Sequence, residues 1–353
     1  MAKTMHDSFT LRHTTIPNRI CVPPMVIFGY SDETGMVTDR NVAHYQKLAQ
    51  GDPGLIIVEA TCVSPEGKLS DNQLGIWSDA HIEGHKRIAE AIHAENRPAL
   101  IQIHHAGVVG IADQPLCPSA YLNTRRDGSQ VCGQELTIED ILRLQQAYIA
   151  AGQRAWQAGY DGIELHGCHS YLISQFFNSR VNTRPDEYAD AMTFVRPIVE
   201  GIRTATDDDF IIGIRLGAYE PTLEDGITHA KALDAIGIDF LDISYGFDRE
   251  ADPTCPEDWP YVDVVWAAGE IKKHVNAPVF AVNSINKPSE AADILVRTDV
   301  DMVDIGRSFL VDFDWAKKAL AGETPGYCLH CPKCVWRGAA ECPGQKLMNR
   351  NQK

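Results

Sequence analysis

Eight short runs of β-branched and aliphatic residues recur along this chain, and stretches with helical periodicity separate them. The runs are Arg19–Val22, Leu55–Glu59, Ala99–His104, Gly162–Leu165, Phe210–Leu216, Phe240–Ser244, Val279–Asn283 and Met302–Ile305. Continuous apolar strands that alternate with helices are typical of a parallel sheet covered on both faces. Eight such units over about 300 residues predict a closed (β/α)8 barrel, the TIM barrel.

The stretches between the runs are amphipathic, as in "SDAHIEGHKRIAEAIHAEN" and "IEDILRLQQAYIAAGQRAWQAG". Ser78 or Asp79 is expected to cap the first helix, and Gly159 is expected to end the second. A doubly wound open sheet is the alternative, but no G-x-G-x-x-G motif follows an early strand. We therefore expect a barrel over residues 1–322 and a cysteine-rich extension over residues 323–353.

The charge balance excludes some partners. The net charge of −16 disfavours nucleic acid and anionic membranes, because both need clustered Lys and Arg. No apolar run approaches the ~18 residues of a membrane span, and the first residues lack a signal-peptide core, so a cytoplasmic protein is expected. An anionic cofactor remains compatible, because a few arginines and backbone N–H groups suffice to bind phosphate.

Polar residues follow the predicted strands where the strands end. Because these ends meet at one mouth of a barrel, the residues are expected to form one site. Strand alternation places Gln102 and His104 on one face of the third strand. It places Arg215 and Gly213 on one face of the fifth strand, where the glycine is expected to leave space for a flat ligand. The alternative is an interior layer of polar side chains that only satisfy one another.

The last two strands carry a phosphate signal. Asn283–Ser284 follow the seventh run and Gly306–Arg307 follow the eighth. Loops at these two places are the usual phosphate site of such barrels, and arginine binds phosphate through two N–H groups. The sequence thus predicts a phosphorylated ligand at the barrel mouth.

Several segments together resemble the Old Yellow Enzyme family of FMN-dependent ene-reductases. They are "IPNRICVPPM", "LGIWSDAHIEGHKRIAEAI", "IQIHHAG", "GIELHGCHSYLISQFFNSRVNTRPDEY" and "DIGRSFL", and the likeness runs from about Ile16 to Phe313. The resemblance implies bound FMN, reduction of activated C=C bonds in unsaturated carbonyl or enoyl compounds, and NAD(P)H as electron donor. It also allows a separate electron-donor protein and a homo-oligomer.

The resemblance assigns roles to individual positions. His166 and His169 would hydrogen-bond the activating oxygen of the substrate, and Tyr171 would donate the proton. The flavin contacts would be Pro24, Met25, Ala60, Gln102, Arg215, Asn283, Ser284, Gly306 and Arg307, with the last four at the phosphate. Departures from the family pattern stand at Val26, Phe28, Val108 and Ser284.

Four cysteines crowd the end of the sequence. Cys328, Cys331, Cys334 and Cys342 have a C-x2-C-x2-C-x7-C spacing, which suits a [4Fe–4S] cluster or a zinc ion held by all four thiolates. The tail resembles the region after the barrel in the dienoyl-CoA reductase branch, although the spacing there is longer. Unligated cysteines are the third alternative.

Two other classes of function compete with the reductase. A zinc-dependent barrel hydrolase would use His166 and His169 with Glu164 and His104, but it would not explain Gln102, Arg215 and Gly306–Arg307 together. A flavin and iron–sulfur protein for electron transfer or redox sensing would depend on the cysteine tail rather than on the pocket.

Overall fold

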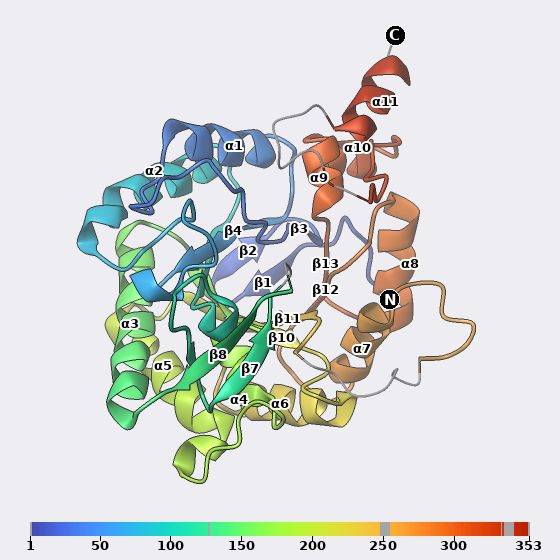
Figure 1. The fold of residues 1–353 in the computed structure, drawn as a ribbon. Coiled ribbons are helices and arrows are strands. Elements are labelled where there is room, and N and C mark those ends of the chain that lie inside the picture. Colours follow the sequence, from blue (N-terminus) through green and yellow to red (C-terminus); the bar gives the residue numbers. More distant parts are fainter. Residues whose placement is uncertain (1, 126–127, 248–254, 333, 335–341, 352–353) are drawn as a thin grey trace.

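The fold is a closed parallel barrel, shown in Figure 1. This computed structural model describes all residues except 1, 126–127, 248–254, 333, 335–341 and 352–353. Within them the barrel strands run in chain order, and β13 pairs back with β3. They are β3 (Ile20–Val22), β4 (Leu55–Cys62), β5 (Ala99–His104), β9 (Gly162–Gly167), β10 (Ile211–Gly217), β11 (Phe240–Ser244), β12 (Val279–Ala281) and β13 (Met302–Asp304). Each predicted run carries one strand, so the predicted (β/α)8 barrel is confirmed.

Helices surround the strands. They are α1 (Asp39–Ala49), α2 (Ile82–His93), α3 (Ile138–Gln157), α4 (Leu172–Phe177), α5 (Ala191–Ala205), α6 (Leu223–Ala235), α7 (Asp263–Lys272), α8 (Pro288–Thr298), α9 (Arg307–Val311), α10 (Trp315–Leu320) and α11 (Pro343–Asn351). Ser78 caps a 3-10 turn that leads into α2, and Gly159 follows α3 with φ of 85°. No helix in the described residues combines the length and the apolar character needed to cross a bilayer.

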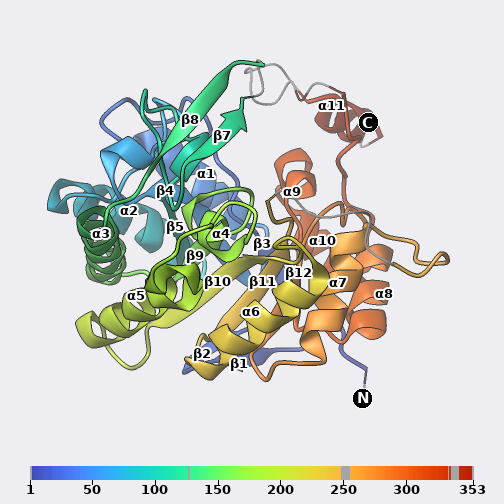
Figure 2. The same cartoon turned by 60° about the horizontal axis from the view of Figure 1, so that its bottom comes forward.

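An N-terminal hairpin covers the base of the barrel. Its strands β1 (Phe9–Leu11) and β2 (Thr14–Ile16) lie at the bottom of Figure 2, opposite the cysteine-rich end of the chain. Their inward residues join the lowest layer of the barrel interior. That apolar layer consists of Leu11, Ile16, Cys21, Leu55, Ile57, Leu100, Ile211, Phe240, Phe280 and Met302.

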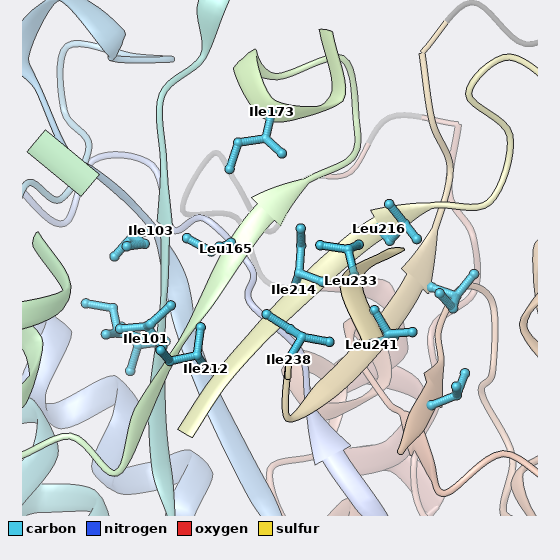
Figure 3. Close-up of a cluster of buried hydrophobic side chains, with 14 of the residues drawn as sticks. Ile101, Ile103, Leu165, Ile173, Ile212, Ile214, Leu216, Leu233, Ile238 and Leu241 are labelled. Carbon is cyan, nitrogen blue, oxygen red and sulfur yellow. The ribbon is translucent and has the colours of Figure 1, made fainter. Parts of the chain in front are cut away.

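A second and larger core lies between the strands and the helices. Figure 3 shows part of it, where the outward side chains of β5, β9, β10 and β11 meet helical residues such as Ile173 and Leu233. Each outward position alternates with an inward one. Ile101 and Ile103 therefore point outward, and Gln102 and His104 point into the barrel, as the alternation predicts.

The barrel interior changes from apolar to polar along the strands. Above the apolar base stand Gln102, Glu164, Asp242 and Asp304, which are all buried. Gly213 lies at the boundary, where an added Cβ would meet the Phe240 ring at 2.0 Å. The prediction that Gly213 leaves space for a ligand is therefore wrong, because the glycine accommodates Phe240.

The two long segments 106–136 and 167–190 are not plain loops. The first contains a three-stranded sheet, and the second contains α4 and a 3-10 turn. The sheet consists of β6 (Leu116–Cys117), β7 (Tyr121–Thr124) and β8 (Gln130–Glu135). Their residues are exposed or half-buried except Cys117 and Gly133, so the segment lacks the apolar run that marks a buried strand.

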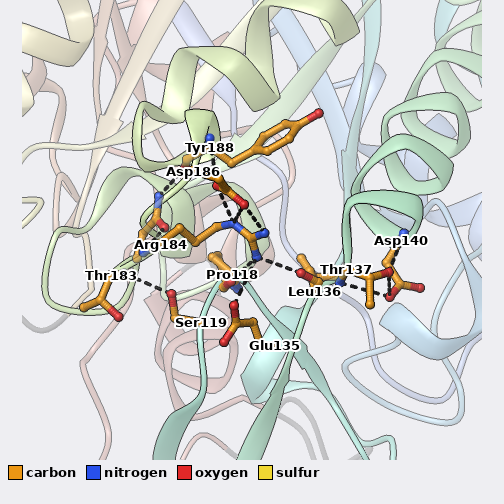
Figure 4. Close-up of polar contacts among 11 residues, drawn as sticks. Pro118, Ser119, Glu135, Leu136, Thr137, Asp140, Thr183, Arg184, Asp186 and Tyr188 are labelled. Atoms are coloured by element: carbon orange, nitrogen blue, oxygen red, sulfur yellow. Dashed lines mark hydrogen bonds and ion pairs between the residues drawn. The ribbon is translucent and has the colours of Figure 1, made fainter.

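Arg184 joins these two segments, as Figure 4 shows. Its Nη1 donates to the carbonyl oxygens of Pro118 and Leu136 at 2.8 and 2.7 Å, and its Nε donates to Asp186 at 2.9 Å. Arg184 and Asp186 belong to the "NTRPDEY" motif that supports the family resemblance. Arg184 and Asp186 therefore hold the segment 106–136, which contains β6, β7 and β8, at the barrel mouth.

Candidate active site

A cavity of about 1180 Å3 opens at the carboxyl ends of the barrel strands. Its wall comes from the loops that follow the strands, from β7, and from the cysteine-rich tail. The sequence-predicted residues on this wall are Pro24, Met25, His169, Tyr171, Arg215, Asn283, Ser284, Gly306, Arg307, Cys331 and Cys334. The strand ends therefore converge on one site, as predicted.

His166 and His169 lie side by side with ring centroids 5.2 Å apart. His166 belongs to β9 and is buried, whereas His169 faces the cavity from a turn in which φ is 55°. The backbone N–H of His169 donates to the carbonyl of Tyr245 at 3.0 Å. Its Nε2 lies 2.6 Å from Oγ of Ser244, which also accepts from Asn283 at 3.2 Å. Three strand ends thus fix the position of His169.

Both imidazoles are uncharged at neutral pH. Burial, followed by the charges of His169, His104 and Arg215, lowers the pKa of His166 far below its ordinary value. His169 is open to the cavity but otherwise enclosed by protein, and this enclosure together with Arg215 lowers its pKa as well. A neutral imidazole keeps one N–H donor and one lone pair, so the pair can donate to a ligand or bind a metal.

Tyr171 stands at the N-terminal end of α4 and lines the cavity. Its ring centroid lies 4.5 Å from that of His166 and 5.2 Å from that of His104. The three predicted catalytic residues are therefore in one cluster, and His104 is a further member of it. Gln73 donates to the carbonyl of Ala60 at 2.7 Å, and the same amide nitrogen lies 2.5 Å from Nε2 of His104.

Arg215 carries the positive charge at the floor of the cavity. Its Nε donates to Asp242 of β11, and its Nη2 donates to Asp304 of β13 at 3.1 Å. Burial and the charge of Asp242 raise the pKa of Glu164 and of Asp304 well above their ordinary values. These shifts favour neutral Glu164 and Asp304 beside the Arg215 guanidinium.

Three predicted residues lie behind the cavity wall rather than on it: Ala60, Gln102 and His166. Nε2 of Gln102 donates to Glu164 at 2.6 Å, so its amide points along the barrel interior. Ala60 contributes its carbonyl oxygen to Gln73. Val26 and Phe28, which depart from the family pattern, are on the wall.

The part of the cavity wall that follows β12 and β13 suits a phosphate. Asn283 and Ser284 have left-handed backbones with φ of 91° and 55°. An added Cβ at Gly306 would come within 3.3 Å of Met25 Sδ, so the glycine keeps this wall free of a side chain. The Arg307 side chain is exposed and makes no ion pair with any described residue.

These residues fit a flat anionic cofactor such as FMN. The cavity exceeds the ~300–1,000 Å3 of ordinary ligand pockets, so it has room for a ring system and a substrate. Nη1 of Arg215 has no hydrogen bond within the described part of the chain, so it is available to a ring carbonyl or nitrogen. Arg307 is available to a phosphate elsewhere on the same wall.

The cysteine tail reaches the same cavity. The N–H of Cys328 donates to Oγ of Ser308 at 3.2 Å, and His330 contacts the Asn286 amide at 2.9 Å. Cys331 and Cys334 line the wall. The four tail sulfurs do not form a group of ligand atoms within 4.8 Å in the described residues, so a metal there stays a prediction.

The zinc set predicted for a hydrolase is not assembled either. In the described chain, the ligand atoms that gather within 4.8 Å belong to His166, Cys168 and His169. Glu164 accepts a hydrogen bond from Gln102, and His104 is hydrogen-bonded to Gln73, so neither joins the two histidines in a ligand group. The sequence patterns did not indicate Asp242 or Asp304 as residues of the site. Each of these aspartates is the single charged residue in an apolar strand, which is the signal that could have found them.

The barrel and its site define a class: a parallel barrel whose cavity, at the carboxyl ends of the strands, suits a flat, anionic cofactor. Residues 5–324 match the NADH:flavin oxidoreductase / NADH oxidase family, so the chain belongs to that family. The predicted kinship with the Old Yellow Enzyme family, and with it a flavin-dependent oxidoreductase, is confirmed.

Individual relatives agree with this assignment. The chain is 38% identical over 328 residues to an NADH oxidase of Thermoanaerobacter brockii, covering 87% of this chain and 49% of that protein. It therefore spans about half the length of that relative. It is 33% identical over 319 residues to an NADPH dehydrogenase of Bacillus cytotoxicus, covering 88% and 90%. A solved structure of 2-naphthoyl-CoA reductase shares the fold with a TM-score of 0.85 and 24% identity, covering 96% of this chain and 56% of that one.

Proposed function

We propose that this protein is an FMN-dependent reductase of activated C=C bonds that takes electrons from NAD(P)H. The observation that carries the proposal is one cavity lined by His169, Tyr171 and two available arginines, with the neutral imidazole of His166 packed directly behind His169 and Tyr171. The names of the T. brockii and B. cytotoxicus relatives support a nicotinamide donor. The substrate class we infer is an unsaturated carbonyl or enoyl compound.

FMN would supply the hydride, and the protein residues would polarise and protonate the substrate. We assign to His166 and His169 the N–H donors that stabilise negative charge on the carbonyl oxygen of the substrate. Pre-aimed donors of this kind are worth about 10²–10³-fold each in rate. Tyr171 would deliver a proton to the α-carbon as a general acid.

Arg215 and the loop residues would hold the cofactor. Arg215, anchored by Asp242 and Asp304, would place its free Nη1 against the pyrimidine part of the ring system. Gln102 would hold Glu164 in place beneath it, with Pro24, Met25 and Ala60 around the ring. Asn283, Ser284, Gly306 and Arg307 would bind the phosphate, as the family resemblance implies.

The tail is proposed to carry an electron-transfer group. Cys328, Cys331, Cys334 and Cys342 would bind a [4Fe–4S] cluster, with a zinc ion on the same four thiolates as the alternative. The position of Cys331 and Cys334 on the cavity wall favours a group that exchanges electrons with the flavin. This same observation favours the second candidate function, an electron-transfer or redox-sensing protein.

Purification under anaerobic conditions tests the cofactors. We expect a yellow protein with about one FMN per chain, whose spectrum changes on addition of NADH or NADPH. Iron, sulfide and zinc analysis identifies the group in the tail. A colourless protein that does not take up FMN would refute the proposed function. A yellow protein that is reduced by NAD(P)H but consumes no 2-cyclohexenone would favour the redox-sensing alternative.

Replacing Tyr171 with phenylalanine tests the proton donor. The Tyr171→Phe substitution removes only the hydroxyl, so flavin reduction by NAD(P)H should keep its rate. The reoxidation of reduced enzyme by 2-cyclohexenone should slow by about 10²-fold, a typical contribution of general acid catalysis. Stopped-flow absorbance separates the two half-reactions. Equal slowing of both would show that Tyr171 shapes the cavity instead of donating the proton.

A further inference from the structure

We propose that His166, Cys168 and His169 form a binding site for a thiophilic divalent cation such as Zn2+. In the described residues, one ligand atom from each of the three lies within 4.8 Å of the other two. Two imidazole nitrogens and one thiolate are a typical zinc donor set. This set differs from the four tail cysteines and from the carboxylate-containing set of a barrel hydrolase.

The distance between the two buried ligands fits an ion. Sγ of Cys168 lies 3.7 Å from Nδ1 of His166. A tetrahedral ion with Zn–S of about 2.3 Å and Zn–N of about 2.05 Å would hold these atoms about 3.5 Å apart. The two side chains therefore need to move by only a few tenths of an ångström.

The third ligand gives the ion a way in. His166 and Cys168 are buried, whereas His169 lines the cavity. An ion that enters from the cavity would reach His169 first, and its fourth coordination position would stay open to the cavity. The carboxyl groups of Glu164, Asp242 and Glu220 and the cation Arg215 lie near Cys168. Burial raises the pKa of the Cys168 thiol, so an ion that binds there would displace the thiol proton.

The consequence for catalysis rests on the function proposed above. An ion would use imidazole lone pairs and hold the rings about 2.1 Å away, whereas the substrate oxygen needs N–H donors at about 3 Å. The two imidazoles cannot satisfy both arrangements. A displacement of about 1 Å at a reacting group can cost about 10²-fold in rate. Zinc bound at this site should therefore inhibit alkene reduction.

The test compares the full, FMN-loaded chain with its Cys168→Ser variant. Zinc binding is measured by isothermal titration calorimetry, and inhibition is measured with NAD(P)H and 2-cyclohexenone. The tail cysteines contribute equally to both proteins, so the variant should bind one zinc fewer. Its inhibition should need at least about tenfold more zinc. Cys132→Ser, which changes an exposed cysteine of β8, is the matched control and should behave like the unaltered protein.

The outcomes separate this inference from the proposed function. Equal zinc stoichiometry in the unaltered protein and in Cys168→Ser would overturn the site. If Cys168→Ser does not fold, Cys168→Ala and His169→Asn are measured for zinc binding alone, and each should also lose one zinc. Loss of that zinc in a protein that turns over no alkene would support the site and refute the reductase. Turnover that is unchanged with zinc bound at Cys168 would overturn the inhibition.

Discussion

Replacing His166 and His169 together with alanine is expected to lower the rate of alkene reduction by at least about 10³-fold. Both rings are neutral and adjacent, and they form one donor pair with centroids 5.2 Å apart. Without them no N–H group at this position stabilises the charge that develops on the substrate oxygen. The rate is measured as the reoxidation of reduced enzyme by 2-cyclohexenone.

The flavin content distinguishes a catalytic effect from damage to the fold. Because the proposed flavin contacts lie on other strands, the double variant should stay yellow with about one FMN per chain. His274→Ala changes an exposed histidine after α7 and should leave the rate unaltered. A double variant that loses its flavin would mean that the two histidines support the cofactor site rather than the substrate.

The barrel could be predicted from the sequence because its strands are buried on both faces. Runs such as Leu55–Glu59 have apolar residues at both inward and outward positions, and few other structures produce this pattern eight times. The sheet of β6, β7 and β8 could not be found in this way. Its strands are short and only two of their residues are buried, and Arg184, which lies far away in the sequence, donates to the carbonyls of Pro118 and Leu136 beside them.

The position of a site residue could be predicted where the residue follows the end of a strand. It was harder to predict where contacts with neighbouring strands determine the hydrogen-bond partner of the side chain. His169, Tyr171 and Arg307 line the cavity because they follow β9 and β13 directly. Gln102 also points inward, yet its amide binds Glu164 and not the cavity. Spacing along one strand gives the face of a side chain, but the neighbouring strand determines its hydrogen-bond partner.

The buried charges inside the barrel explain why Arg215 matters beyond the cofactor. The Arg215 guanidinium forms ion pairs with Asp242 of β11 and Asp304 of β13, and Glu164 lies beside them. One oxygen on each of these three carboxylates has no hydrogen bond to any described residue. Removal of the guanidinium would leave the group with no positive charge at all, so stability and cofactor binding depend on the same side chain.

Replacing Arg215 with methionine is therefore expected to lower the free energy of unfolding by about 3–5 kcal/mol at pH 8, the usual cost of leaving buried charge uncompensated. The measurement is urea denaturation of the FMN-free protein followed by circular dichroism. Arg297→Met, which removes an exposed i,i+4 ion pair with Asp293, is the matched control and should change stability little.

The loss should depend on pH. Burial already raises the folded-state pKa of Glu164 and Asp304, and removing Arg215 raises it further. A carboxyl with a raised folded pKa binds protons in the folded state that the unfolded state has released, so stability falls as pH rises through that folded pKa. The deficit of Arg215→Met should therefore be smaller at pH 5 than at pH 8.

Adding Asp242→Asn and Asp304→Asn to Arg215→Met should restore most of the stability at pH 8, because the amides need no counter-charge. A deficit that is equal at both values of pH and persists in the triple variant would show that Arg215 stabilises the barrel by packing and not by charge.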